Sequence, residues 1–189
     1  MLLTVGHGPD GRAALAARLG GAGVERLVDV RRFPGSRSNP DVRREALEVW
    51  LPEAGITYRW DARLGGRRSL PRDEPVADAW WTVAQFAAYA AHTRTPEFIA
   101  ALDEVLAEAA DAVVAVMCSE YVWWRCHRRL IADVTVLGRG LEVRHVMPDG
   151  RLADHRPSEG AVVDVDGAVR WPASPGAGSG GPSAARTSP

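Results

Sequence analysis

The sequence predicts an α/β fold: a single three-layer domain with a mostly parallel β-sheet, followed by a C-terminal β-hairpin and a disordered tail. Short apolar, β-branched segments alternate with helical segments along the chain, and such alternation gives parallel strands joined by right-handed crossovers. Segment 112–117 is apolar on both faces, as in a central parallel strand. The length of 189 residues and the apolar content of 46% suit one domain with a sizeable core.

The first half of the chain supplies three expected strands and two expected helices. Strands are expected at 2–6, 26–30 and 56–60, and helices at 12–19 and from Asn39-Pro40 to about Leu51. Gly20-Gly21 is a helix stop, while Asn39 and Pro40 suit the N-cap and the first position of the second helix. Segment 64–76 is rich in Gly, Pro and Arg and is expected to be irregular.

The second half continues the alternation. Helices are expected at 83–92, 96–110 and 125–137, strands at 112–117 and 141–146, and a hairpin with strands 162–165 and 168–171 around the turn Asp166-Gly167. Residues after Trp171 are almost all Pro, Gly, Ser and Ala, which cannot form a core. We therefore expect an α/β domain at 1–155, a hairpin extension at 156–171 and a disordered tail at 172–189.

Composition limits the classes of function. No apolar run approaches the ~18 residues of a membrane span, and the N-terminus lacks the basic region of a signal peptide. Two cysteines do not make a secreted disulfide framework, so we expect free thiols and a cytoplasmic location. A net charge of −1 weighs against tight binding of duplex nucleic acid, which needs many phosphate contacts.

Charge is distributed unevenly along the chain. From Arg31 to Arg72 there are ten arginines and five acids, a balance of +5, whereas Asp73 to Asp111 holds eight acids and one arginine, a balance of −7. This asymmetry could steer an anionic ligand toward one side of the molecule. It could equally reflect two solvated faces.

Reactive and charged residues follow most of the predicted strands. Ligands of open parallel sheets bind beyond the carboxyl ends of the strands, and four of those ends are followed by such residues: His7, Arg31-Arg32, Cys118-Ser119-Glu120 and the region of His145. The helix expected after the fourth strand begins near Cys126 and His127. We therefore predict that one pocket is lined by His7, Arg31, Glu120, Cys126 and His127.

The two cysteines are the candidate nucleophiles. Cys126 is expected in the first turn of a helix and near Arg125 and Arg128, where a thiolate is favoured, so it could be a nucleophile or a metal ligand. Cys118 could be a nucleophile or a small core residue. The geometry argues against a shared ion, because adjacent residues on a helix point about 100° apart. The metal and cofactor content are therefore left open.

Other motif interpretations fail on spacing, and two aromatic pairs have open roles. The cysteines do not form a C-x-x-C pair, no phosphatase-type loop or dinucleotide loop is complete, and the chain contains no lysine for a P-loop. Trp80-Trp81 and Trp123-Trp124 could stack a base or a sugar. They could instead serve in packing or as a lid.

Several ordered sequence blocks together resemble the DUF488 family. The blocks are Thr4-Val5-Gly6-His7-Gly8, Leu27-Val28-Asp29-Val30-Arg31-Arg32-Phe33-Pro34-Gly35-Ser36-Arg37, Gly55-Ile56-Thr57-Tyr58, Leu64-Gly65-Gly66, Met117-Cys118-Ser119-Glu120, Cys126-His127-Arg128-Arg129-Leu130-Ile131-Ala132-Asp133 and Val143-Arg144-His145-Val146. One position departs, because the first block usually ends in serine and here ends in Gly8. The resemblance implies an α/β fold and a site without implying a reaction, and it echoes rhodanese-like folds by analogy only.

Two classes of function follow from these residues. The first is an enzyme acting on a small anionic or nucleotide-like substrate. Its candidate catalytic residues are Cys118, Glu120, Cys126 and His127, and its candidate substrate-binding residues are His7, Asp29, Arg31, Arg37 and Arg128. The alternative is a non-catalytic nucleotide or nucleic-acid binding module that uses the arginine-rich region and the tryptophans. The oligomeric state is left open.

Overall fold

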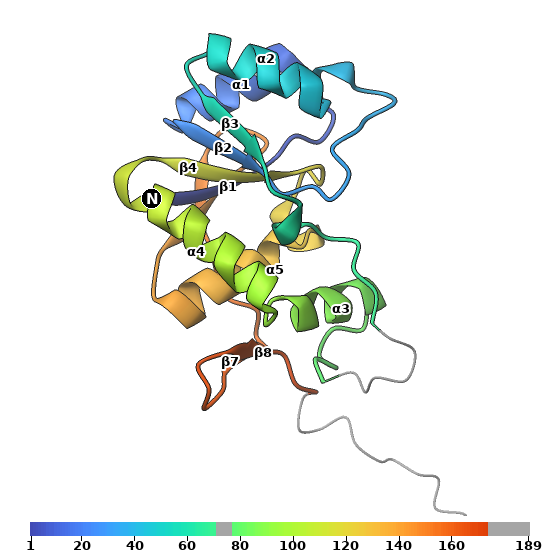
Figure 1. The fold of residues 1–189 in the computed structure, drawn as a ribbon. Helices are drawn as coiled ribbons and strands as arrows, with labels where there is room; N and C mark the ends of the chain where they lie inside the picture. The colour runs from blue at the N-terminus through green and yellow to red at the C-terminus, as the bar shows by residue number, and fades with distance from the viewer. Residues whose placement is uncertain (71–76, 174–189) are drawn as a thin grey trace, which may run out of the picture.

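A computed structural model describes residues 1–70 and 77–173, so the expected tail from residue 174 onward lies outside the described residues. The elements follow in the order β1 (Leu2–Gly6), α1 (Arg12–Gly21), β2 (Arg26–Asp29), a 3₁₀ turn η1 (Pro40–Val42), α2 (Arg44–Glu53), β3 (Thr57–Trp60), η2 (Ala62–Leu64), α3 (Ala84–His92), α4 (Pro96–Asp111), β4 (Val114–Cys118), η3 (Trp123–Arg125), α5 (Arg128–Asp133), a π-helical continuation η4 (Val134–Gly138), β5 (Val143–Val146), β6 (Leu152–Asp154), β7 (Val162–Val163) and β8 (Val169–Arg170). Figure 1 shows this alternation.

The main sheet has the strand order β3-β2-β4-β1-β5-β6. All neighbouring pairs are parallel except β5 and β6, which confirms the predicted α/β class. After β1 the chain continues to β2, which lies on one side of the central pair β4-β1 in the strand order. After β4 it continues to β5, which lies on the other side of that pair. The neighbours β1 and β4 therefore form a topological switch point, the place where open α/β sheets bind their ligands.

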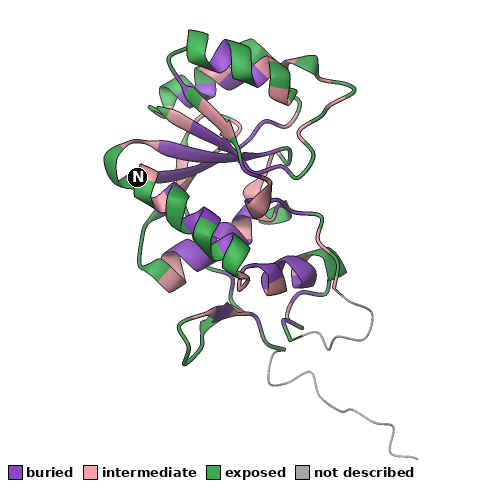
Figure 2. Cartoon of the chain, viewed as in Figure 1, coloured by how far each residue is buried: buried purple, intermediate pink, exposed green. Residues whose placement is uncertain are grey.

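The sheet separates two apolar cores (Figures 1 and 2). Successive strand residues point to opposite faces, so Leu3 and Val5 of β1 pack with α1 and α2, while Leu2 packs in the core that holds α3, α4 and α5. Every residue of β1 and β4 is buried. The side chains of Thr4 and Cys118 lie on the α5 side of these central strands, where a polar group needs a partner.

Two of the expected helices begin later than predicted. Arg43 is extended (φ −66°, ψ 148°), so the helix predicted from Asn39-Pro40 is divided into η1 and α2. Cys126 is extended as well (φ −131°, ψ 149°), and α5 therefore begins at Arg128 and not at Arg125. The prediction that Cys126 lies inside a helical turn was wrong, because the 3₁₀ turn η3 ends just before it.

The C-terminal segment is anchored to the α/β body. Strands β7 and β8 pair antiparallel around Gly167 (φ +79°), as the Asp166-Gly167 turn predicted. The side chain of Trp171 is fully buried, its backbone N–H donates to Asp78 and its indole N–H donates to Asp133. The short strand β6 was not predicted, since its three residues show no strand pattern and its pairing depends on β5.

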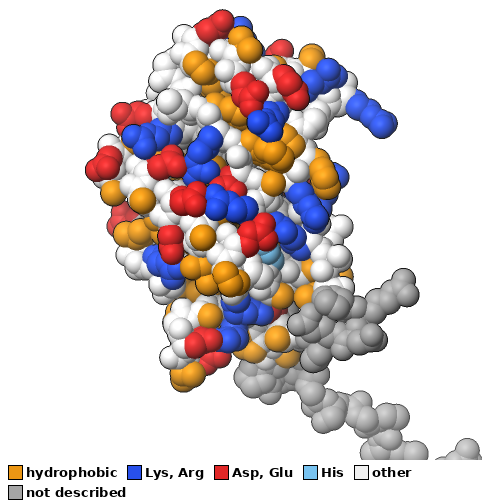
Figure 3. Space-filling view, in the orientation of Figure 1, with side chains coloured by type: hydrophobic (Ala, Val, Ile, Leu, Met, Phe, Trp, Pro, Cys, Tyr) orange, Lys and Arg blue, Asp and Glu red, His pale blue; other side chains and the backbone are white. Residues whose placement is uncertain are grey.

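The uneven charge along the sequence is largely balanced in space. The side chains of Arg59 and Arg63, from the arginine-rich segment, pair with Glu108 and Glu104 of the acidic segment. Arginine and acidic side chains consequently alternate over much of the face drawn in Figure 3. Among the described residues, none of the helices has the length and apolarity of a membrane span.

Candidate functional site

A pocket of about 670 Å³ lies beyond the carboxyl ends of β1, β2 and β4. Its wall is formed by His7, Arg31, Arg32, Phe33, Gly35, Ser36, Gly66, Arg67, Arg68, Gln85, Phe86, Cys118, Ser119, Glu120, Arg125, Cys126 and His127. The five residues predicted to line one pocket are all on this wall. The pocket opens at the switch point between β1 and β4, as expected for this topology.

The loops that follow β1 and β4 are held together by backbone hydrogen bonds. The N–H of His7 donates to Cys118 O and that of Gly8 donates to Ser119 O, each at 3.0 Å. Gly8 has φ +53°, and a Cβ atom there would lie 2.3 Å from the ring of Tyr121. A side chain at this position would therefore clash with Tyr121, which accounts for the glycine.

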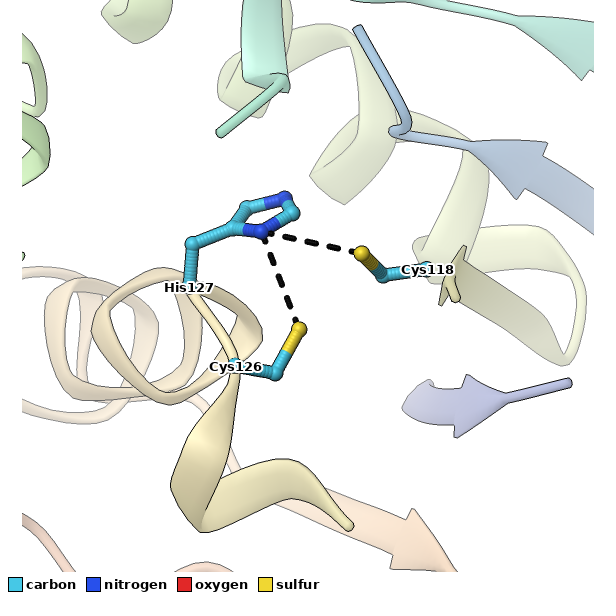
Figure 4. Close-up of side chains that lie close together, drawn as sticks. All are labelled: Cys118, Cys126 and His127. Atoms are coloured by element: carbon cyan, nitrogen blue, oxygen red, sulfur yellow. Dashed lines mark hydrogen bonds between the residues drawn. The ribbon is translucent and has the colours of Figure 1, made fainter. Parts of the chain in front are cut away.

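Two thiols and an imidazole meet at one part of the pocket wall. Cys118 comes from the end of β4, while Cys126 and His127 come from the segment before α5 (Figure 4). Nδ1 of His127 lies 3.7 Å from the Sγ atoms of both cysteines. Both cysteines are free thiols and both are buried. The backbone is extended at Cys126 (ψ 149°) and helical at His127 (φ −58°), and in this conformation the two adjacent side chains point toward the same centre.

The two thiols have opposite ionisation tendencies. Burial opposes ionisation of Cys126, but a hydrogen bond from Cys118 and the positive charge of Arg128 outweigh it and lower the pKa of Cys126 to about 6. Nε of Arg128 donates to Cys126 Sγ at 3.3 Å. The hydrogen bond with Cys126, together with burial, raises the pKa of Cys118 to about 12. At neutral pH the pair is therefore one thiolate and one thiol.

The same three side chains could hold a soft metal ion. Their donor atoms lie within 4.8 Å of one another. Zn–S and Zn–N bonds of ordinary length at tetrahedral angles would separate sulfur from nitrogen by about 3.6 Å, close to the 3.7 Å measured from His127 to each cysteine. The expectation that Cys126 and His127 do not easily share an ion rested on a helical backbone, whereas Cys126 is extended in the structure.

Tyr89 of α3 orients His127 from the side of the helical layer. The two rings meet edge to face with centroids 4.9 Å apart, and the Tyr89 hydroxyl donates to Leu64 O at 2.6 Å. Burial raises the pKa of Tyr89 well above its ordinary value, so the hydroxyl stays protonated. Sequence analysis gave no role to Tyr89, because only tertiary packing brings α3 against the end of β4.

Arg31 and His7 form a buried polar group on the β2 side of the pocket. Asp29 accepts hydrogen bonds from Nε of Arg31 at 2.8 Å and from its backbone N–H at 3.0 Å. Nδ1–H of His7 donates to Gly8 O at 2.8 Å, so Nε2 accepts from Arg31 at 3.3 Å. Burial and the charge of Arg31 lower the pKa of His7. Asp29 is fully buried and positions Arg31, without being part of the described pocket wall.

The pocket wall carries a strong excess of positive charge. It has five arginines (Arg31, Arg32, Arg67, Arg68 and Arg125) and a single acid, Glu120. Of these arginines only Arg31 forms an ion pair with an acid in the described part of the chain. Arg67 adopts the left-handed conformation (φ +57°), which is uncommon for a residue with a side chain and recurs at binding sites.

Other predicted site residues lie away from the wall. Arg37 is exposed and is not among the described wall residues, and Arg128 is almost fully buried behind Cys126. The tryptophan pairs also lie elsewhere: Trp81 is buried beside Trp171, and the ring of Trp123 stacks on His145 at 4.2 Å.

Some wall residues were missed by sequence analysis. Gln85 and Phe86 reach the wall from the start of α3, and no sequence signal marks them. Segment 66–68 was expected to be irregular, and its two arginines entered the prediction only as members of the arginine-rich region 31–72.

A buried histidine behind the pocket is expected to make the fold acid-sensitive. His145 is held by Thr4, His155 and the ring of Trp123, and burial, followed by the nearby His155 and Arg128, lowers its pKa to about 2. In the unfolded chain its pKa is about 6.5. Only the unfolded state then gains this proton between pH 6.5 and 2, so the free energy of unfolding falls as pH falls through this range.

Urea unfolding at pH 7.5 and pH 5.0 measures this effect. Through His145 alone, the wild-type protein is expected to lose about 2 kcal/mol of unfolding free energy between the two values. His145→Asn is expected to be less stable at pH 7.5 but to lose about 2 kcal/mol less on acidification. Equal losses in the two proteins would show that His145 does not carry the acid sensitivity.

Comparison with known proteins gives one family match. The family model described as "Domain of unknown function DUF488" matches residues 12–135. No curated protein matches the chain, and no solved structure matches it. The matched range includes the Cys118, Cys126 and His127 cluster, while β1 and the segment after Thr135 lie outside it.

Proposed function

Because this chain belongs to the DUF488 family, whose description gives no activity, we propose its function from the pocket itself: it is an enzyme that acts on a small anionic or nucleotide-like substrate through a reactive thiolate. The observation that carries the proposal is a buried cysteine, Cys126, held by Arg128 on the wall of an arginine-rich pocket. Arg32, Arg67, Arg68 and Arg125 form no ion pair with described acids. Guanidinium groups that have no carboxylate partner bind phosphate or carboxylate oxygens of a ligand well.

The candidate catalytic residues divide the chemistry among them. Cys126, with its pKa lowered to about 6, attacks an electrophilic centre of the bound substrate as a thiolate. The new bond joins Sγ to that centre, and the leaving group departs with its electron pair. Either His127 or Glu120 supplies the proton that the leaving group takes up, and water then releases the product from the thioester-like adduct. Cys118 keeps its proton and donates it toward Cys126.

A zinc centre is the second candidate, favoured by one observation. The two equal distances of 3.7 Å from His127 to the cysteines match the edges of a tetrahedral Cys₂His site. In that case the arginines would still hold the anion, while the thiolates would be ligands and not nucleophiles. Elemental analysis of protein purified without chelators separates the candidates, because one zinc per chain supports the metal centre and its absence supports the free thiolate.

A small ligand fits better than a long nucleic acid. The arginines Arg59 and Arg63, which an extended binding face would use, already pair with acids, and neither tryptophan pair belongs to the described pocket wall. A reactive thiolate also needs a reducing environment to stay reduced, so the proposal includes a cytoplasmic location.

Anion protection of Cys126 tests the proposed function. Inorganic phosphate and a nucleoside monophosphate, at millimolar concentration, are expected to slow alkylation of Cys126 by iodoacetamide severalfold. The protection should weaken in Arg67→Gln and Arg125→Gln, since both residues are on the pocket wall. It should be unchanged in Arg151→Gln, whose exposed arginine pairs with Asp149 away from the pocket.

The two probes separate the ligand classes. Stronger protection by the nucleotide than by phosphate indicates a nucleotide-like substrate, and equal protection indicates a small anion. Failure of both probes to protect, or equal protection in all four proteins, would contradict anion binding at the pocket.

A further inference from the structure

A fully buried carboxylate lies behind the pocket, at the end of α5. Asp133 accepts hydrogen bonds from His155 at 2.8 Å, from the backbone N–H and hydroxyl of Ser158 at 2.9 and 2.6 Å, and from the indole of Trp171 at 3.1 Å. All three partners belong to the C-terminal segment, which lies outside the matched family range 12–135. Asp133, which lies inside that range, therefore holds this segment in place. Four donors on one buried carboxylate fully satisfy it.

From Asp133 a chain of hydrogen bonds leads back to the thiolate. His155 contacts His145 at 3.0 Å between Nδ1 and Nε2, and Nδ1 of His145 lies 2.7 Å from the Thr4 hydroxyl. That hydroxyl lies 3.4 Å from Nη1 of Arg128. Arg128 in turn donates to Cys126 Sγ and, through Nη2, to Glu120 O.

One set of donors satisfies every bond in the chain with both imidazoles neutral. Arg128 can only donate, so the Thr4 oxygen accepts from it, and in this set the Thr4 proton goes to Nδ1 of His145. His145 is then neutral with its proton on Nε2, which donates to Nδ1 of His155. His155 is left with its own proton on Nε2, which donates to Asp133. Each bond in the series therefore fixes the next one.

We propose that Thr4, His145, His155 and Asp133 are positioning residues that hold the Arg128 guanidinium against Cys126, and that the C-terminal segment thereby forms part of the functional site. The proposal rests on the proposed function, in which Cys126 is the reactive thiolate. None of the four residues is on the described pocket wall, so each acts through Arg128 and not on the substrate.

The arrangement suits positioning better than any other use of these groups. Every polar atom of the two histidines is already paired within the chain, which leaves no lone pair for a metal ion. The ring of Trp123 stacks on His145, which is buried in the middle of the chain. A guanidinium held at all three of its nitrogens cannot turn away from the sulfur, which keeps the thiolate stabilised.

Matched threonine variants test the proposal. Thr4→Val removes the hydroxyl at nearly constant shape, and we expect it to raise the pH midpoint of Cys126 alkylation by half a unit or more. Thr4→Ser restores a hydroxyl and is expected to restore the wild-type midpoint. Thr135→Val is the control, because its hydroxyl is equally buried but bonds only Ile131 O. His155→Phe, which breaks the chain far from the pocket, is expected to shift the midpoint in the same direction as Thr4→Val.

An unchanged midpoint in Thr4→Val, or an equal shift in Thr135→Val, would overturn the proposal. A second readout does not depend on the thiol. Nitrogen chemical shifts of the imidazole rings should show both His145 and His155 as neutral with the proton on Nε2 at pH 7. A proton on Nδ1 of His145 would overturn the proposal even if Cys126 is reactive. A wild-type Cys126 that is not ionised at pH 7, together with the expected tautomers, would instead refute the proposed function alone.

Discussion

Replacement of Arg128 by methionine is expected to slow the alkylation of Cys126 by about tenfold at pH 6 and to move its pH midpoint from about 6 toward about 8.5, the value of a free thiol. Methionine keeps the apolar stem but removes the charge and the Nε–H that donates to Cys126 Sγ at 3.3 Å. Burial then opposes ionisation without compensation from the arginine.

The tenfold decrease expected in the alkylation rate of Arg128→Met follows from two opposing effects. A midpoint of 8.5 leaves less than about 1% of the thiol ionised at pH 6, compared with half in the wild type. The thiolate of higher pKa is intrinsically more nucleophilic, which recovers about a tenfold factor. Iodoacetamide rates measured between pH 5 and 9, with the modified residue located by mass spectrometry, give both quantities.

Arg125→Met is the matched control. Arg125 is exposed on the pocket wall and does not contact the sulfur in the described structure, so its loss should shift the midpoint only slightly. Arg128→Lys keeps a charge without the planar fork and should fall between the wild type and Arg128→Met. Equal shifts for Arg125→Met and Arg128→Met would mean that general pocket charge, and not the bond from Arg128, stabilises the thiolate.

Substitution of Gly6 by alanine is expected to destabilise the protein by about 3 kcal/mol or more. A Cβ atom at Gly6 would lie 1.8 Å from the backbone oxygen of Glu120 and 2.7 Å from Nη2 of Arg128. The Glu120 loop cannot easily retreat, because the strand register and the bond from His7 N to Cys118 O hold it in place. Displacement of Arg128 should also raise the pH midpoint of Cys126.

Gly20→Ala in α1 is the comparison for this substitution. Nothing lies within 4 Å of a Cβ atom at Gly20, so alanine should leave stability unchanged or raise it by up to about 1 kcal/mol. Urea unfolding of the three proteins at pH 7.5 measures the difference. A Gly6→Ala protein as stable as the wild type would show that the loop after β4 is not held against β1.

The fold was largely predictable because its elements carry local signals. The apolar runs of β1, β2 and β4 and the Thr95-Pro96 start of α4, where the Thr95 hydroxyl accepts from Phe98 N, all follow from short-range chemistry. The exceptions depend on neighbours distant in sequence. Strand β6 forms because it pairs with the free edge of β5. The helix near Arg43 is divided because the backbone of Arg43 is extended, and the apolar periodicity of the sequence does not reveal this.

The position of the candidate site was predictable from topology, but the contacts of its side chains were not. Residues that follow parallel strands must meet at one edge of the sheet, and this rule located His7, Arg31 and Cys118. The rule does not give side-chain directions, so Arg128 was assigned to substrate contact although its guanidinium lies against Cys126. Thr4 gave no sign of a role, because its partner His145 is 141 positions away in the sequence.

The pH dependence of Cys126 alkylation in the wild-type protein tests the central claim most directly. Full-length protein is treated with iodoacetamide at pH values from 4.5 to 9.5, and the modification of each cysteine is followed by mass spectrometry. We expect a half-maximal rate for Cys126 near pH 6 and little modification of Cys118 at pH 7, since its pKa is raised to about 12. A half-maximal rate for Cys126 at or above pH 8.5, or faster reaction at Cys118, would contradict it.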